Sequence, residues 1–393
     1  MASLYGFVKR IYLVFNPPAP EAPSASPLRF GILGAANIAP IALILPVKNH
    51  SDAVVKAVAA RDQGRADAFA KKHGIPKAYG GAGSYQKLLD DPEIDVVYNP
   101  LPNGLHYEWT MKALAAGKHV LLEKPSTNTA EETRRMFLFA QEKGLVLLEA
   151  FHYRFHPATR RVKEIIDSGE LGTITKIEAS LAVPGGFIKD NDIRMVYDLG
   201  GGSMMDMGCY PLSISRYLAG ADPTKVISAK ADIHPKFPQI DIGTTATLAF
   251  PSLRGSIESH DGLTATLHAH FRLPPQLGFL PRWPRAFVRV AGTRGTVELN
   301  NFPGPWIYHS ITVESSEHEG GPLRRRTEKH YGNLGWTTQL EAFVNKLRGH
   351  TPEHWHDAQD SITNMEWIEA IYKETGLGSR PVSTAEVPRT TAT

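Results

Sequence analysis

The sequence is poor in several features that would each indicate a particular class of protein. It has a single cysteine, Cys209, so an intramolecular disulfide is excluded and a reducing compartment such as the cytoplasm is favoured. Every apolar run is cut by a charge well before the roughly 18 residues that a membrane-spanning helix needs. The 43 Lys and Arg residues barely exceed the 40 Asp and Glu residues, which leaves little charge for a phosphate-binding face. We therefore expect a cytoplasmic protein that binds neither membranes nor nucleic acids.

The length and composition indicate a globular protein with two domains. The chain has 393 residues, of which 42% are hydrophobic and 21% charged, and a chain of this length exceeds one ordinary core. Residues 1–27 begin with a short apolar and basic stretch and become rich in Pro, Ala and Ser, which predicts an arm and linker more than a cleaved targeting peptide. We assign residues 28–150 to a first domain and 151–393 to a second.

The first domain alternates strand-like and helix-like segments. Helical periods separate nearly continuous apolar runs, which are the pattern of a parallel sheet covered on both faces. The runs are residues 30–35, 54–60, 95–100, 119–124 and 145–150. This pattern predicts a doubly wound α/β domain of the dinucleotide-binding, or Rossmann, type.

The second domain is rich in β-branched residues and has few helical segments between its strands. Consecutive strands of this kind predict an α+β domain with a large, mainly antiparallel open sheet. The expected strands are residues 173–183, 225–233, 243–250, 254–260, 264–271, 286–300 and 310–317. Residues 337–349 and 357–376 are helical by period, and the second helix, about 357–375, is a candidate to pack back on the first domain.

The turn after the first strand resembles a degenerate phosphate-binding fingerprint. Gly34 stands where the first glycine of GxGxxG makes a tight turn, whereas Ala36 and Ala39 replace the other two glycines. A pyrophosphate can still approach a helix N-terminus across alanine. An ordinary strand-to-helix turn is the alternative, but the early position in a βαβ unit favours nucleotide binding.

The residues after the second strand bear on cofactor choice. Arg61 directly follows the strand and can pair with a 2′-phosphate, as in NADP, and Arg65 lies one helical turn further on. Asp62 can instead accept from the free ribose hydroxyl of NAD. We expect Arg61 to decide the choice in favour of NADP, while Arg65 is also compatible with a solvated helix start.

Two further loops should meet at the carboxyl edge of the sheet, where open α/β folds bind ligands. Residues 99–106 contribute Pro100, Asn103 and His106, and the segment EKP at 123–125 contributes Glu123 and Lys124. Lys124 can act there as a fixed positive charge. A lysine that merely extends from a strand end into solvent is the alternative.

The stretch at 198–213 offers a partner for Lys124. A glycine run at 200–202 precedes a helix on which Asp206 and Tyr210 are four residues apart and therefore share a face. A phenol with an ordinary pKa of about 10 is a poor base unless a cation stabilises its anion, and Lys124 is such a cation. Burial of either residue in the core would not explain the glycine run.

Together, EKP, the degenerate glycine turn, EAFHYRFHP (149–157) and GGGSMMDMGCYP (200–211) resemble the glucose-fructose oxidoreductase and inositol dehydrogenase family, Gfo/Idh/MocA. Within it the chain is most similar to the dimeric dihydrodiol dehydrogenases and the fungal NADP-dependent D-xylose 1-dehydrogenases. The resemblance implies that Lys124 is the catalytic lysine and Tyr210 the acid/base. It also implies a homodimer packed sheet against sheet. Inositol dehydrogenases carry histidine at the position of Tyr210, so their cyclitol specificity is not carried over.

Two histidines and one cysteine have alternative readings. His152 and His156, four residues apart, could hold a metal ion, but no third ligand has a recognisable spacing, so we expect no metal. We favour a cleft wall that includes Arg154 and Phe155. Cys209 is interpreted as a core residue because no basic neighbour would activate it.

We predict NADP-dependent oxidation of an aldopyranose at C1, with D-xylose as the favoured sugar. Tyr210 is the expected acid/base, Lys124 keeps it partly ionised, and Asp206 assists as a third catalytic residue. Expected substrate contacts are His152, Phe155, Asp206 and Tyr210. Expected cofactor contacts are Gly34, Ala36, Asn37, Ile38, Arg61, Arg65, Pro100, Asn103, His106, Glu123, Lys124 and Arg154. The alternatives are a trans-1,2-dihydrodiol substrate and a cofactor-binding regulator without turnover.

Overall fold

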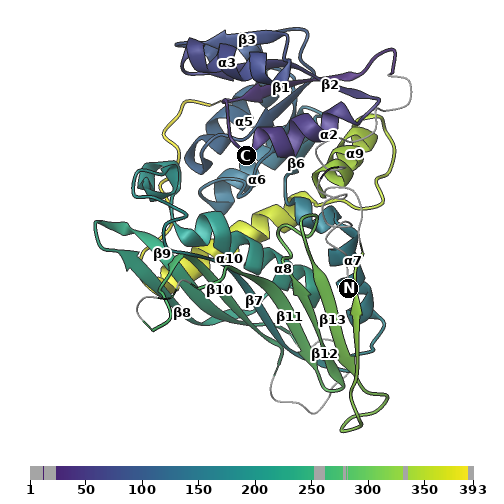
Figure 1. Cartoon of the computed structure of the whole chain (residues 1–393). Helices are drawn as coiled ribbons and strands as arrows, with labels where there is room; N and C mark the ends of the chain where they lie inside the picture. Colours follow the sequence, from purple (N-terminus) through teal and green to yellow (C-terminus); the bar gives the residue numbers. More distant parts are fainter. Residues whose placement is uncertain are drawn as a thin grey trace.

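The computed structural model describes residues 12, 24–251, 262–277, 280, 282–330 and 335–387. The strand expected at 254–260 and most of the arm at 1–27 lie outside these residues. Figure 1 shows two layers that each contain a sheet, with the sheet of the first domain above and that of the second domain below. Among the described residues, no helix is both long and apolar enough to cross a membrane.

The first sheet has six parallel strands in the order β3-β2-β1-β4-β5-β6. Its strands are β1 (Leu28–Leu33), β2 (Ala53–Ala60), β3 (Lys77–Gly80), β4 (Val96–Asn99), β5 (His119–Leu122) and β6 (Leu147–Glu149). Five of these six strands were expected from the sequence. The exception is β3, which is short and only half-buried and therefore shows no clear apolar run. The order reverses between β1 and β4, so the chain has the switch point at which doubly wound folds bind ligands.

Helices cover both faces of this sheet. They are α2 (Leu45–Lys48), which follows the π-helix η1 (Pro40–Ile44), α3 (Gln63–His73), α4 (Ser84–Leu89), α5 (His106–Ala115) and α6 (Ala130–Glu142). One core also receives Trp336, Leu340 and Phe343 from α9 (Gly335–Leu347), which pack with Phe30 and Leu43. A helix from the far end of the chain therefore completes the first domain.

The second sheet has eight strands in the order β14-β13-β12-β11-β7-β10-β9-β8. All neighbouring pairs are antiparallel except β7 and β10, which are parallel. The strands are β7 (Ile174–Pro184), β8 (Lys225–His234), β9 (Phe237–Ala249), β10 (Thr264–Leu273), β11 (Arg285–Gly292), β12 (Gly295–Asn300), β13 (Ser310–Ser315) and β14 (Arg324–Glu328). The predicted fold class, a Rossmann domain with a mainly antiparallel α+β domain, is confirmed.

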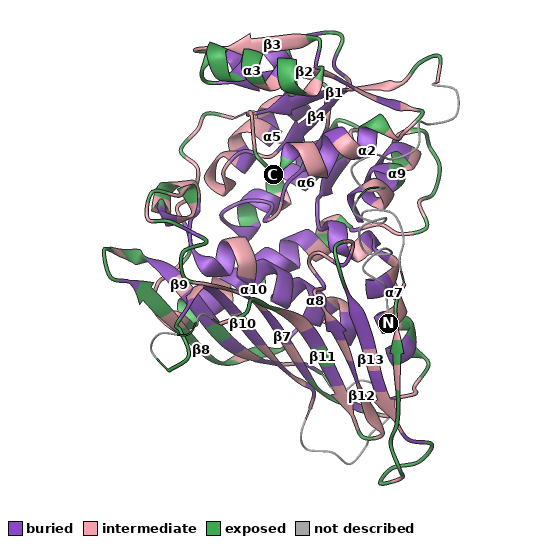
Figure 2. Cartoon of the chain, in the orientation of Figure 1, coloured by how far each residue is buried: buried purple, intermediate pink, exposed green. Residues whose placement is uncertain are grey.

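In the part of the chain that the structure describes, helices cover one face of the second sheet, the face toward the first domain (Figure 1). They are α7 (Pro157–Asp167), α8 (Cys209–Ala219) and α10 (Ala358–Thr375). Their apolar residues form one core with the inner face of the sheet, and the buried positions are concentrated there in Figure 2. The helix expected at 357–375 is α10, which belongs to this core and also contacts α6 of the first domain.

Alternation along β10 decides which side chains face outward. Ala265 and Leu267 lie in the core, so Thr266 and His268 point to the uncovered face. The homodimer expected from the sequence would therefore place Thr266 and His268, and not the apolar residues of this strand, against a second copy of the chain.

Candidate active site

The turn after β1 has the geometry that a close ligand approach requires. Gly34 has a φ of +86°, and a Cβ added there would lie 3.1 Å from Leu101. Its backbone N–H donates to the carbonyl of Ala59 in β2, at 2.7 Å. Asn37 and Ile38 follow as exposed residues at the start of the next helical segment. The turn is thus tight and its outer surface open.

The two residues after β2 have different environments. Arg61 is exposed immediately beyond the strand. Asp62 is the N-cap of α3, and its Oδ1 accepts a hydrogen bond of 2.8 Å from the backbone N–H of Arg65. An N-cap carboxylate already satisfies a helix donor, so Asp62 is committed to the helix while the Arg61 guanidinium is available. The exposed Arg65 lies in the first turn of α3.

His106 braces the loop after β4 from inside. Its Nδ1 and Nε2 lie 2.8 and 2.7 Å from the carbonyl oxygens of Pro125 and Leu101, and burial lowers its pKa to about 4. The residue is fully buried, so the expected cofactor contact from His106 is corrected. It instead joins the loop to the turn after β5.

Asn103, in the 3-10 turn η2 (Asn103–Leu105), reaches the second domain. Its side chain donates to the carbonyl of Gly200 at 3.1 Å. Pro100, at the start of the same loop, is half-buried. The loop after β4 therefore meets the glycine run of the second domain at the sheet edge.

Glu123 and Lys124 follow β5 at this edge and point to different partners. Glu123 is buried and accepts a 2.7 Å hydrogen bond from the phenol of Tyr98, and burial raises its pKa. Lys124 extends toward the second domain, where its Nζ lies 3.1 Å from Oδ1 of Asp206 and donates to the carbonyl of Asp206 at 2.8 Å. Lys124 is therefore anchored between the two domains.

Asp206, in the π-helix η6 (Met204–Gly208), lies between two cations. Its Oδ2 accepts a 2.6 Å hydrogen bond from Nε of Arg194, and its Oδ1 faces Lys124. Burial opposes ionisation of Asp206, but the two positive charges outweigh it and hold the pKa well below its usual value. Burial also lowers the pKa of Lys124, yet the carboxylate raises it above normal. The pair is charged at neutral pH.

Arg194 was not recognised in the sequence. It lies in the 3-10 turn η4 (Ile193–Met195), where Asp192 caps the turn and also binds its guanidinium at 3.0 Å. The pattern Asp-x-Arg is too common to mark a site. The signal lies in the pairing with Asp206, which only the folded chain brings about.

Tyr210, in the first turn of α8, lies under Lys124. The ammonium is 5.1 Å from the centre of the phenol ring. Burial raises the pKa of Tyr210, and the charge of Lys124 opposes this only in part. The phenol is therefore protonated at neutral pH, which corrects the expectation that Lys124 keeps it partly ionised. In this state Tyr210 can donate a proton.

His152 lies next to Tyr210, but its ring already contacts other residues. The two rings are 6.1 Å apart, and His152 stacks on Trp336 at 4.0 Å while its Nε2 lies 2.7 Å from the carbonyl of Pro303. Burial lowers its pKa to about 4, so the ring is neutral. It supports the wall behind Tyr210.

Arg154 and Phe155 lie in the interior and not at the sheet edge. Arg154 forms a 2.8 Å ion pair with Asp360 of α10 and stacks over Tyr217, 4.3 Å from the ring centre. Phe155 is 1% exposed and packs in the core of the first domain. The expected contacts of Arg154 with the cofactor and of Phe155 with the substrate are therefore corrected, because the 3-10 turn η3 (His152–Phe155) turns both inward.

Two other chemical possibilities have little support in this region. Burial raises the pKa of Cys209 to about 12, so its thiol is not a nucleophile at neutral pH. Among the residues that the structure describes, no cluster of three or more His, Cys, Asp or Glu side chains is arranged to hold a metal ion.

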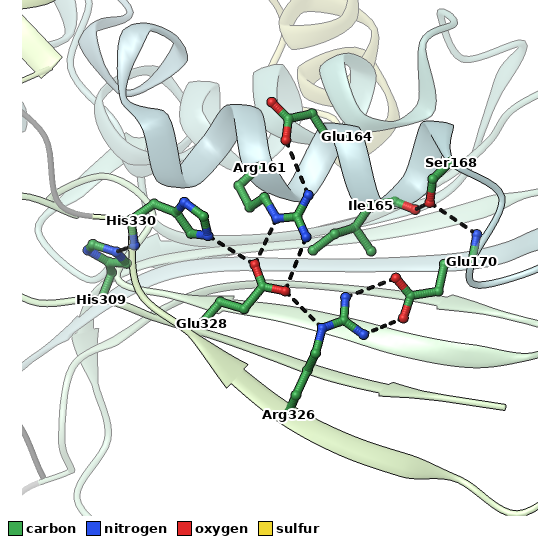
Figure 3. A network of polar contacts seen from close by, with 9 residues as sticks. All are labelled: Arg161, Glu164, Ile165, Ser168, Glu170, His309, Arg326, Glu328 and His330. Carbon is green, nitrogen blue, oxygen red and sulfur yellow. Dashed lines mark hydrogen bonds and ion pairs between the residues drawn. The ribbon is translucent and has the colours of Figure 1, made fainter.

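A separate charge network lies between α7 and the edge strand β14 of the second sheet (Figure 3). Glu328 of β14 accepts from Nε of Arg161, at 2.7 Å, and from Nε of Arg326, at 2.8 Å. Arg326 also forms an ion pair with Glu170. Arg324 and Arg325 of this edge strand are exposed, whereas Arg326 joins the strand to the segment that follows α7.

Family models match most of the chain. Residues 28–151 match the oxidoreductase family model with an NAD-binding Rossmann fold, and residues 159–298 match the GFO/IDH/MocA C-terminal domain. The first match spans the strands β1 to β6, and the second runs from α7 into β12 and ends before β13.

Individual relatives match three quarters or more of the chain. D-xylose 1-dehydrogenase (NADP(+)) 2 of Haloferax volcanii is 36% identical over 355 residues, which are 90% of this chain and 98% of the relative. Trans-1,2-dihydrobenzene-1,2-diol dehydrogenase of Mus musculus is 32% identical over 75% of this chain and 80% of its own length. A crystal structure of a 3-ketoreductase from Actinomadura kijaniata, in complex with NADP and TDP-benzene, has a TM-score of 0.75 and 28% identity over 91% of this chain and 99% of that one. The resemblance inferred from the motifs is thereby confirmed, and the chain belongs to the GFO/IDH/MocA family of oxidoreductases.

Proposed function

We propose that this protein is an NADP-dependent dehydrogenase that oxidises an aldopyranose at C1, with D-xylose as substrate and D-xylonolactone as product. The observation that carries the proposal is the meeting of Lys124, Asp206 and Tyr210 at the carboxyl edge of the first sheet. The substrate is inferred from the relative in Haloferax volcanii, which matches over almost its full length.

Tyr210 is the proposed acid/base. Oxidation removes the proton of the anomeric hydroxyl to the phenolate oxygen, while the C1 hydrogen leaves with its electron pair as hydride. Reduction of a carbonyl uses the opposite transfer, from the neutral phenol. Because burial raises the pKa of Tyr210, the neutral form predominates at pH 7 and only a minor fraction serves oxidation.

Lys124 is proposed to orient the reacting oxygen and to stabilise charge on Tyr210. Its own charge is secured by Asp206, which is in turn paired with Arg194. With both carboxylate oxygens engaged, Asp206 is better suited to hold Lys124 in place than to bind a sugar hydroxyl. We therefore assign Asp206 a positioning role.

The residues at the sheet edge fit a bound NADP. Gly34 provides a tight open turn for a pyrophosphate, and Arg61 is free for a 2′-phosphate because Asp62 caps α3. The cofactor supplies the hydride acceptor when bound. Asn103 and Lys124 then hold the second domain against the same edge through Gly200 and Asp206.

A second candidate keeps the same residues and takes a trans-1,2-dihydrodiol. It is favoured by the mouse relative and by the aromatic rings of Phe151, His152 and Tyr153, whose centres lie 5.6, 6.1 and 5.9 Å from that of Tyr210. A regulator without turnover would not need the charged pair beside a phenol.

The test is a spectrophotometric assay of NADP reduction with D-xylose, D-glucose, other aldoses and trans-1,2-dihydrobenzene-1,2-diol, repeated with Tyr210→Phe. We expect D-xylose to give the highest kcat/KM and the variant to lose this activity. A higher value for the dihydrodiol would support the second candidate, and no turnover with any of them would refute both.

A further inference from the structure

A second buried ion pair lies next to the turn at residues 200–206, which carries Asp206. Arg380, in the segment after α10, forms a 2.7 Å pair with Asp241 of β9, and both side chains are 0% exposed. The central carbon of its guanidinium also lies 3.9 Å from the centre of the ring of Tyr372. Burying a charge pair costs free energy unless hydrogen bonds satisfy both groups. The hydrogen-bond partners of Arg380 and Asp241 therefore show which segments the pair connects.

Asp241 gathers five donors, two of which begin the segment that carries Asp206. Its Oδ2 accepts from the hydroxyl of Ser203 and from the backbone N–H of Met204, both at 2.7 Å, and from Thr244 at 2.7 Å. Its Oδ1 accepts from Arg380 and from the phenol of Tyr372. The carboxylate thus anchors the start of η6.

Arg380 also binds the glycine run directly. Its Nε donates to the carbonyl of Gly201 at 2.7 Å. Gly202 has a φ of +124°, and a Cβ there would lie 2.2 Å from Oδ1 of Asp241 and 2.5 Å from Nη2 of Arg380. A side chain at position 202 would therefore collide with this ion pair, which explains why the residue there is glycine.

The segment around Arg380 continues onto the first domain. The carbonyl of Pro381 accepts from the side chain of Asn128 at 2.8 Å, and the backbone N–H of Ser383 donates to Glu132 at 2.6 Å. Asn128 is four residues after Lys124, and a Cβ added at Gly200 would lie 2.2 Å from its Oδ1. Residues 380–383 therefore touch both segments that supply the charged pair of the site.

We propose that Arg380 is a positioning residue, which acts through Asp241 and Gly201 to hold the turn at 200–206 so that Asp206 meets Lys124. This role rests on the proposed function, in which the Lys124–Asp206 pair supports Tyr210. Residues 380–383 form a strap that fixes the second-domain turn relative to the first domain.

The test uses the full chain with two variants, Arg380→Met and the double variant Arg380→Met/Asp241→Asn. The double variant removes both buried charges, so it remains informative if the single variant fails to fold. We expect kcat to fall about tenfold or more, as for small misplacements of catalytic groups, with the KM for NADP almost unchanged. The pH profile of kcat should also move to higher pH, because a displaced Lys124 stabilises the Tyr210 anion less. Folded variants with the kcat and pH profile of the wild type would overturn the inference.

Arg161→Met is the matched control, because it removes an arginine that joins α7 to the edge strand β14 (Figure 3), whereas Asp241 lies on β9, near the opposite edge of the sheet. It should leave kcat and its pH profile unchanged. A second measurement is independent of turnover: backbone amides of residues 201–206 should exchange with deuterium faster in the double variant than in the wild type or Arg161→Met. If the wild type oxidises no sugar, the proposed function fails, while unchanged exchange in the double variant would overturn the strap whatever the activity.

Discussion

The ammonium nitrogen of Lys124 lies 3.1 Å from a carboxylate oxygen of Asp206 and also donates to the backbone carbonyl of that residue. The two residues come from different domains, so the contact fixes a charge at the place where the domains meet. Asp206 keeps Lys124 protonated in a buried position that would otherwise lower its pKa.

Replacing Tyr210 with phenylalanine should lower turnover by about 10² or more, because the acid/base is lost while the ring remains. NADP affinity, measured by fluorescence titration, should stay near that of the wild type. Tyr308→Phe, at a half-exposed phenol between β12 and β13, serves as control and should keep full activity. Near-normal turnover of Tyr210→Phe would disprove the assignment.

Lys124 and Tyr210 should behave as one unit in kinetics. Lys124→Met alone should reduce kcat strongly, but adding it to Tyr210→Phe should cost much less than the product of the two single effects. A double-mutant cycle on kcat/KM measures this. Strictly multiplicative losses would mean that the two residues act independently.

Oxidation should become faster as the pH rises from 6 to 9. Burial raises the pKa of Tyr210 above its ordinary value of about 10, so the phenolate that accepts the proton increases about tenfold for each pH unit below that pKa. Carbonyl reduction uses the protonated phenol, which predominates throughout this range, and should change little. Initial rates in both directions test this, and an oxidation rate that declines steadily above pH 7 would contradict it.

Arg61→Ala should raise the KM for NADP by roughly ten- to a hundredfold, since a charge-assisted pair is worth about 1.5 to 3 kcal/mol. The KM for NAD should hardly change. Asp62→Ala is the matched control: it should cost about 1 kcal/mol of stability by removing the cap of α3 and leave the preference for NADP intact. A shift in NAD use by Asp62→Ala would identify Asp62 as the ribose contact.

We predict a homodimer in which the eight-stranded sheet of one copy packs with its uncovered face against that of the other copy. Light scattering at micromolar concentration should give twice the chain mass, and Thr266→Arg, on that face, should shift the protein toward monomer. Gln141→Arg, at an exposed position of α6 in the first domain, is the control and should remain dimeric. A wild-type monomer at that concentration would refute the prediction.

The fold class could be predicted from the sequence because the spacing of apolar residues within each segment shows how that segment is buried. Near-continuous apolar runs marked the two-sided parallel sheet, and alternation marked the second sheet. The strand β3 (Lys77–Gly80) escaped because it is half-buried and too short to show a period. Alternation along β10 also tells which of its residues face inward and which face outward.

The site was only partly predictable, because its decisive contacts join distant segments. Lys124 and Tyr210 each stand in a recognisable motif, so they were found. Arg194 and Arg380 stand in no motif, and Arg380 meets Asp241 across 139 residues of sequence. Burial of Arg154 and His106 likewise depends on what packs over them, which the local sequence does not reveal.

The contribution of α9 to the first core has a consequence for how the protein is made. The six strands of the first sheet end at Glu149, yet Trp336, Leu340 and Phe343 fill one of its faces. Domains usually fold as units while the chain emerges from the ribosome, the N-terminal one first. Here one face of the first sheet stays uncovered until the entire second sheet has been synthesised, so we expect the two layers to complete their folding together. A fragment that stops near residue 150 should expose an apolar surface and aggregate.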